Sequence, residues 1–171
     1  ADFGIATAIV LGGDLSLTWA EQIATGLVRE SRASVRQQDA LRGLAEFDLL
    51  RTEVMSGQYL DILHQSGGFR STGGDAESAA LAVIRWKTVP YTVLRPVRIG
   101  AALSGAQDSA LEDLGSWAME VGTAFQLRDD LLSVVGDTGS TGKPIGGDIV
   151  EGKRTVLLAR TITAADTQAR D

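Results

Sequence analysis

The sequence has no cysteine, only three lysines and a single histidine among its 171 residues. Without cysteine, the chain can form neither a disulfide framework nor a thiolate metal site. Acidic residues outnumber basic ones by 22 to 16, and the net charge of -6 argues against a nucleic-acid binder, which needs basic residues for phosphate contacts. His64 falls at the end of a helical pattern, where helix-end hydrogen bonding or exposure to solvent is expected rather than catalysis.

Long apolar runs are also missing. The most apolar stretch, residues 5–20, is interrupted by Gly12, Gly13 and Asp14. It is therefore too short and too polar to cross a bilayer core of about 30 Å. The first residues carry no basic region ahead of an apolar one, so they do not resemble a signal peptide. We expect a soluble, cytoplasmic protein with no stable membrane insertion. Because Asp14 lies within an apolar stretch, we expect it to be capped by a partner or to belong to a site.

Helical periodicity dominates what remains. Apolar residues recur at helical spacing and no alternating strand pattern is found, which predicts an all-α bundle of long antiparallel helices in a single domain, residues 1–171. Asp75 is the expected N-cap of one helix. The predicted helices cover residues 5–30, 37–64, 78–86, 109–135 and 156–162.

A proline interrupts the third helical pattern. Pro90 removes one backbone hydrogen bond and its ring collides with the carbonyl four residues earlier, so a kink is expected at residues 86–90. Lys87 and Thr88 lie in this kink, where a bent axis can turn both side chains toward one cavity. The alternative is that the helix ends there and a second helix begins before Arg95.

Two adjacent carboxylates stand in the apolar run of residues 125–137. On a helix, five polar side chains of this run fall within an arc of roughly 100°, and apolar side chains flank them. Such a narrow acidic face is either a solvated stripe or one wall of a metal site. Its members are Gln126, Asp129, Asp130, Ser133 and Asp137.

The three lysines help to decide between these readings. Lys87 lies in the expected kink, while Lys143 and Lys153 follow the acidic face on a glycine-rich segment. All other basic residues except the histidine are arginines, which suggests that a compact ammonium group is needed at these places. Carboxylates alone would repel a diphosphate, but Mg²⁺ shared between oxygen ligands of the protein and of the phosphates would bind it, and the lysines would neutralise its remaining charge.

These residues resemble motifs of the trans-isoprenyl diphosphate synthases, or polyprenyl synthetases. The resemblance rests on several segments in the same order, which together cover essentially the whole chain. They are Gly12-Gly13-Asp14, Gly57-Gln58-x-x-Asp61, Lys87-Thr88, Phe125-Gln126-x-x-Asp129-Asp130, Gly142-Lys143-Pro144, Gly147-Asp148-Ile149 and Glu151-Gly152-Lys153-Arg154-Thr155.

The resemblance implies an isoprenoid-synthase fold and a prenyltransferase. Such an enzyme condenses isopentenyl diphosphate with an allylic diphosphate, giving a geranyl-, farnesyl- or geranylgeranyl-type product. It implies Mg²⁺ on Asp129 and Asp130, diphosphate binding by the three lysines, and an allylic cation held near Thr88 and Gln126. It also implies a homodimer.

Two departures from the family pattern affect these expectations. Ser133 stands where the second aspartate-rich motif has its last aspartate, and we do not assign it to metal. The first aspartate-rich motif has no counterpart in this sequence. We therefore expect the chain to be part of a larger synthase domain, without its N-terminal helices and last C-terminal helices, and to be inactive alone.

Two other classes of protein remain open. A non-catalytic or regulatory homologue would share the bundle, and Ser133 together with the absent first motif favours it. A purely structural bundle would instead scatter Lys87, Lys143 and Asp129 over different faces.

Overall fold

The computed structural model describes residues 2–29, 35–66, 76–136 and 146–165, and in these ranges the chain is helical, with no strand. The predicted all-α class is therefore confirmed. The α-helices are α1 (Asp2–Arg29), α2 (Gln37–Gln65), α3 (Ala76–Val83), α4 (Arg95–Leu103), α5 (Asp108–Val135), α7 (Gly147–Val150) and α8 (Val156–Ala164). The expected cap Asp75 lies outside the described residues.

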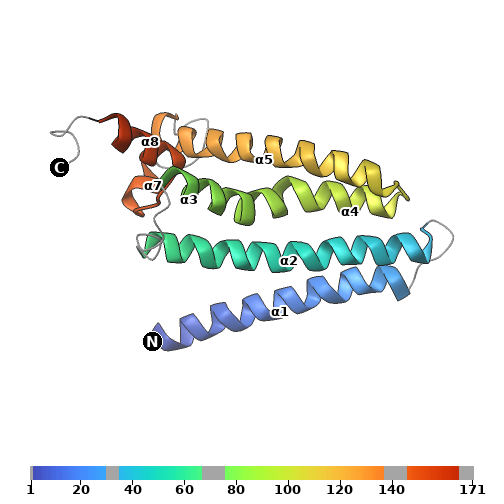
Figure 1. Ribbon diagram of the computed structural model, residues 1–171. Coiled ribbons are helices and arrows are strands. Elements are labelled where there is room, and N and C mark those ends of the chain that lie inside the picture. The colour runs from blue at the N-terminus through green and yellow to red at the C-terminus, as the bar shows by residue number, and fades with distance from the viewer. Residues whose placement is uncertain (1, 30–34, 67–75, 137–145, 166–171) are drawn as a thin grey trace.

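The long helices run alternately up and down, each beside the next (Figure 1). α1 packs on α2, the path from α3 to α4 lies between α2 and α5, and α7 and α8 cover the end of the bundle where α5 ends and α3 begins (Figure 1). The antiparallel arrangement expected from the sequence is thus present. It brings the C-terminal end of α5 to the same end of the bundle as α3, α7 and α8 (Figure 1).

The chain does not break at Pro90. Two π-helical segments, η2 (Ile84–Thr88) and η3 (Pro90–Leu94), connect α3 to α4, and the residue between them, Val89, keeps helical dihedral angles. A π-turn bonds each N–H to the carbonyl five residues earlier, which avoids the i−4 position that proline disturbs. The helix therefore continues through the disturbance with wider turns, and the alternative of two separate helices is wrong.

Two glycines let this helix lie close to its neighbours. A Cβ at Gly57 of α2 would lie 2.4 Å from Lys87 Cα, and one at Gly122 of α5 would lie 3.0 Å from Val89 Cγ1. Val89 and Pro90 are fully buried. The disturbed helix is thus wedged between α2 and α5, and this tight fit fixes the position of its side chains.

A buried ion cluster joins the other end of the same helix to α2. Arg95 donates to Glu53 and Glu46, and Arg98 donates to Glu46 Oε1 at 2.8 Å and to the backbone carbonyl of Leu111 at 3.0 Å. Burial opposes the charge of Glu46, but hydrogen bonds from the two arginines outweigh this and lower its pKa. The cluster fixes α4 against α2.

α1 packs less closely than the other long helices. It approaches α2 toward its C-terminal end and diverges from it toward its N-terminal end (Figure 1). Asp14 is exposed on this helix, and its expected partner or role in a site stays a prediction. Among the described helices, none has the length and apolar character that a membrane span requires. The exposed large apolar residues of α1 are Ile5, Ile9, Val10, Leu11, Leu15, Leu17, Trp19, Ile23 and Leu27.

Candidate functional site

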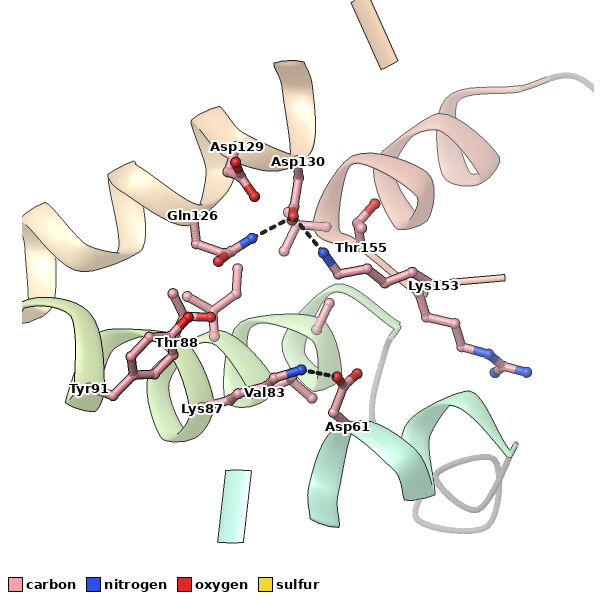
Figure 2. Close-up of a pocket in the computed structure, with 14 residues that line it drawn as sticks. Asp61, Val83, Lys87, Thr88, Tyr91, Gln126, Asp129, Asp130, Lys153 and Thr155 are labelled. Atoms are coloured by element: carbon pink, nitrogen blue, oxygen red, sulfur yellow. Dashed lines mark hydrogen bonds and ion pairs between the residues drawn. The ribbon is translucent and has the colours of Figure 1, made fainter. Parts of the chain in front are cut away.

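A cavity of about 210 Å³ opens where η2, α5 and the segment before α8 meet. Its wall combines carboxylates, ammonium and hydroxyl groups with a few apolar side chains (Figure 2). The lining residues are Asp61, Ala80, Val83, Ile84, Lys87, Thr88, Tyr91, Gln126, Asp129, Asp130, Lys153, Arg154, Thr155 and Val156. All catalytic and metal residues expected from the sequence, and two of the three expected lysines, lie in this one place.

The acidic face of α5 forms one wall of the cavity. Gln126, Asp129 and Asp130 all line it, and Asp130 is only 3% exposed. The apolar neighbours on the same helix are turned outward, with Phe125 52% and Leu131 45% exposed. The face is thus not a solvated stripe, because its polar side is more shielded from water than its apolar flanks.

Asp130 is the centre of a hydrogen-bonded group. Its Oδ1 atom accepts from Gln126 Nε2 at 2.7 Å and from Lys153 Nζ at 3.3 Å (Figure 2). Burial raises the pKa of Asp130, and the amide of Gln126 and the charge of Lys153 oppose this only in part. The carboxylate is therefore under-compensated, which means that an additional cation at this place would be stabilised.

Lys153 lies between two carboxylates. Its Nζ atom is 3.3 Å from Asp130 Oδ1 and 3.4 Å from Asp148 Oδ2. Burial opposes its charge, but Asp130 and Asp148 outweigh this and raise the pKa of Lys153, so it stays an ammonium group. Thr155, two residues on, caps α8 by accepting from the backbone N–H of Leu158 at 3.1 Å, which fixes where this segment ends.

Lys87 faces the same cavity from η2 and is held by α2. Its Nζ atom lies 2.5 Å from Oδ2 of Asp61, whose other oxygen accepts from Gln65 Nε2 at 3.1 Å. Asp61 stands one helical turn after Gly57, so the glycine that admits η2 and the carboxylate that holds its lysine share one face of α2. Thr88, next to the lysine, is buried and also lines the cavity.

The structure brings Lys87, Thr88, Gln126, Asp129 and Lys153 together at this cavity. This clustering contradicts the scatter that a purely structural bundle predicts. Two further candidates, Lys143 and Asp137, lie outside the described residues.

Asp61 and Asp148 belong to the motifs given above, but neither was assigned a role from the sequence. Tyr91 was not among the predicted site residues. The signal for Asp61 was its spacing from Gly57, and the signal for Asp148 was the lysine five positions later. Neither signal says which lysine a carboxylate will meet. Tyr91 follows Pro90 in η3 and lines the cavity.

His64 lies at the end of α2 and is 3% exposed, so the alternative of exposure to solvent is wrong. Burial and the charge of Arg154 lower its pKa, while Asp61 raises it less. His64 is not among the residues that line the cavity, which agrees with the expectation of a structural position at a helix end.

Comparisons with known proteins agree with this geometry. The chain is 29% identical over 163 residues to geranylfarnesyl diphosphate synthase of Aeropyrum pernix, covering 93% of this chain and 49% of that protein. It is 30% identical over 169 residues to geranylgeranyl diphosphate synthase of Mycobacterium tuberculosis, covering 99% and 44%. The chain thus spans about half the length of the curated relatives it matches.

A solved structure shares the fold. Geranylgeranyl pyrophosphate synthase of Corynebacterium glutamicum, crystallised with isoprenyl diphosphate and magnesium, superposes with a TM-score of 0.80 and is 37% identical. The match covers 99% of this chain and 45% of the other. The family model for polyprenyl synthetases matches residues 1–171. With two of the lysines, the paired carboxylates and the π-helical turns gathered around one cavity, the chain belongs to the polyprenyl synthetase family.

Proposed function

We propose that the protein to which this chain belongs condenses isopentenyl diphosphate with an allylic diphosphate to give a longer polyprenyl diphosphate. The observation that carries this proposal is that Lys87 and Lys153 line one cavity together with the α5 carboxylates Asp129 and Asp130. The named activities of the relatives support it, since these are synthases of geranylgeranyl and geranylfarnesyl diphosphate.

Magnesium fits the oxygen ligands of this cavity. Within the described ranges, no group of three or more histidine, cysteine, aspartate and glutamate residues could hold a metal ion alone. Mg²⁺ is commonly bound by one or two carboxylates together with waters and substrate phosphates, so Asp129 and Asp130 could supply the protein's share. The under-compensated charge of Asp130 and the magnesium in the Corynebacterium glutamicum structure support this assignment. Bound there, Mg²⁺ would supply Lewis-acid stabilisation of negative charge on the diphosphate oxygens.

The lysines would bind the diphosphate of the allylic substrate. Lys87 and Lys153 carry ammonium donors already held in place by Asp61 and by Asp130 with Asp148. Charge-assisted hydrogen bonds from these groups stabilise the diphosphate more as its charge grows on leaving. Lys143 is proposed as a third such group.

The reaction begins when the allylic carbon–oxygen bond breaks and the diphosphate leaves with the electron pair. The double bond of isopentenyl diphosphate attacks the allylic cation, and the departing diphosphate accepts the proton that is then lost. Thr88 and Gln126 would hold the cation, because both present polar oxygen atoms at the cavity. Donation by Gln126 Nε2 to Asp130 fixes the plane of its amide group for this task.

The test is a product assay on the full-length protein with labelled isopentenyl diphosphate, Mg²⁺ and allylic primers of several lengths. A longer polyprenyl diphosphate is expected, and light scattering on the same sample will determine whether the protein is the proposed homodimer. Binding of the allylic diphosphate without turnover by any primer would favour the non-catalytic homologue, for which Ser133 is the specific observation. Lack of binding by a folded protein would refute both.

A further inference from the structure

Ser133 ties the last turn of α5 to the segment that returns toward the cavity. Its backbone carbonyl accepts from Gly146 N at 2.7 Å, and its Oγ atom lies 2.8 Å from Asp148 Oδ2. α5 ends at Val135, so carbonyls of its last turn need partners from outside the helix. Gly146 has a φ of 78°, a left-handed conformation that glycine adopts readily, and α7 begins directly after it.

The hydroxyl group of Ser133 donates its hydrogen bond to the carboxylate of Asp148. The Oγ atom is 2.8 Å from the carbonyl oxygen of Asp130 and 2.8 Å from the Asp148 carboxylate, but it has one proton to donate. The carboxylate is the stronger acceptor, because hydrogen bonds to an ionised group are shorter and stronger than neutral ones.

Asp148 in turn contacts Lys153 through both its side chain and its backbone. Its carboxylate lies 3.4 Å from Lys153 Nζ, and its backbone carbonyl accepts from Lys153 N at 2.9 Å. The position of the ammonium group in the cavity therefore depends on the position of Asp148, which in turn depends on Ser133.

We propose that Ser133 is a positioning residue for Lys153, acting through Asp148, rather than a lost metal ligand. This inference rests on the proposed function, in which Lys153 binds the diphosphate. An aspartate at position 133 would put a second carboxylate against Asp148 with no proton between them, and the like charges would repel. The arrangement observed here thus needs a hydroxyl group at this position rather than a carboxylate.

Three substitutions separate the two readings. Ser133→Ala should raise the KM for the allylic diphosphate about tenfold, the size expected for one charge-assisted hydrogen bond, with a much smaller change in kcat. Ser133→Thr keeps the hydroxyl and should restore the wild-type KM. Ser133→Asp should be at least as impaired as Ser133→Ala. The matched control is Ser116→Ala on the same helix, because Ser116 is exposed and bonds only its own helix, at the Glu112 carbonyl.

Calorimetry with inorganic diphosphate and Mg²⁺ gives a readout that does not need turnover. The Kd should weaken in Ser133→Ala and Ser133→Asp but not in Ser133→Thr or Ser116→Ala. Improved activity of Ser133→Asp, or equal KM and Kd for Ser133→Ala and the control, would overturn the positioning role while leaving the proposed function intact. Absence of turnover in the wild type, with the Kd pattern retained, would refute the proposed function and support the positioning role.

Discussion

Gly57 of α2 and Lys87 of η2 meet backbone to backbone, so closely that a Cβ at position 57 would lie 2.4 Å from both Cα and N of Lys87. The contact determines how deeply the π-helical turns can approach α2. It also brings the lysine within 2.5 Å of Asp61, one turn further along α2. A contact between main chains therefore decides the position of a charge in the cavity.

Replacing Gly57 by alanine should separate η2 from α2. Overpacking of this kind typically costs about 1–3 kcal/mol, and the contacted atoms are main-chain atoms that cannot rotate away. We expect a lower free energy of unfolding in urea and weaker binding of the allylic diphosphate. Gly100→Ala is the control, because nothing lies within 4 Å of a Cβ at that helical position and alanine favours the helix. Equal stability of the two variants would contradict the close contact.

Removing the charge of Lys87 should affect stability and binding separately. Lys87→Met leaves Asp61, whose side chain is 9% exposed, with Gln65 as a remaining donor, so we expect a loss of about 1–3 kcal/mol in the free energy of unfolding. The double variant Asp61→Asn/Lys87→Met removes the unpaired charge and should recover most of that stability. It should not recover affinity for the allylic diphosphate. Recovery of affinity would show that Lys87 does not bind the substrate.

Asp130 should make the fold less stable as the pH rises. Its pKa is raised in the folded state, chiefly by burial, so the protonated form is favoured by folding. The corresponding stability is fully present below the ordinary aspartate pKa of 3.8 and is lost as the pH rises through the higher pKa of the folded state. In the absence of divalent cations, Asp130→Asn should therefore melt at a higher temperature than the wild type at neutral pH. The difference should shrink toward pH 4, and a constant difference would contradict this cause.

The ion cluster of α2 and α4 should matter more than the ion pair at the surface. Arg95→Ala leaves the buried Glu46 and the partly buried Glu53 with less compensation, and breaking a buried pair in this way typically costs about 3–5 kcal/mol. Arg160→Ala removes an exposed pair with Glu77, and such a pair contributes little to stability because water screens it. Chemical denaturation of both variants provides the comparison. Similar losses for the two variants would show that water reaches the cluster.

The sequence predicted what depends on local chemistry. The acidic face of α5 follows from helical spacing, and the disturbance at Pro90 follows from a missing N–H and a steric collision. The continuation of the helix as π-turns was not predicted, because it depends on the close packing against Gly57 and Gly122 that holds the helix in place. Local rules describe where a helix is disturbed, but not whether its neighbours keep it helical.

Contacts between side chains of different helices were harder to predict from the sequence. Nothing in the spacing of Asp61 and Lys87 indicates that they meet, since α2 and η2 are separate elements brought together by packing. Ser133 was interpreted as a departure because the family motif has an aspartate there, and its hydrogen bond to Asp148, fifteen residues later in the chain, could not be predicted from spacing. Lys87, Lys153 and Asp129 could be grouped correctly, but by the chemistry that a diphosphate needs rather than by geometry.

The π-turns also set the register of everything that follows them. A π-turn accommodates one residue more than an α-turn, so each side chain of α4 is rotated about the axis from where an unbroken α3 would have placed it. The rotation determines that Arg95 and Arg98 meet Glu46. Deleting a single residue from 84–94 would therefore act at both ends of the helix, dislodging the arginines from their glutamate as well as Thr88 and Tyr91 from the cavity. Insertions and deletions should be rarer here than in any loop of the chain.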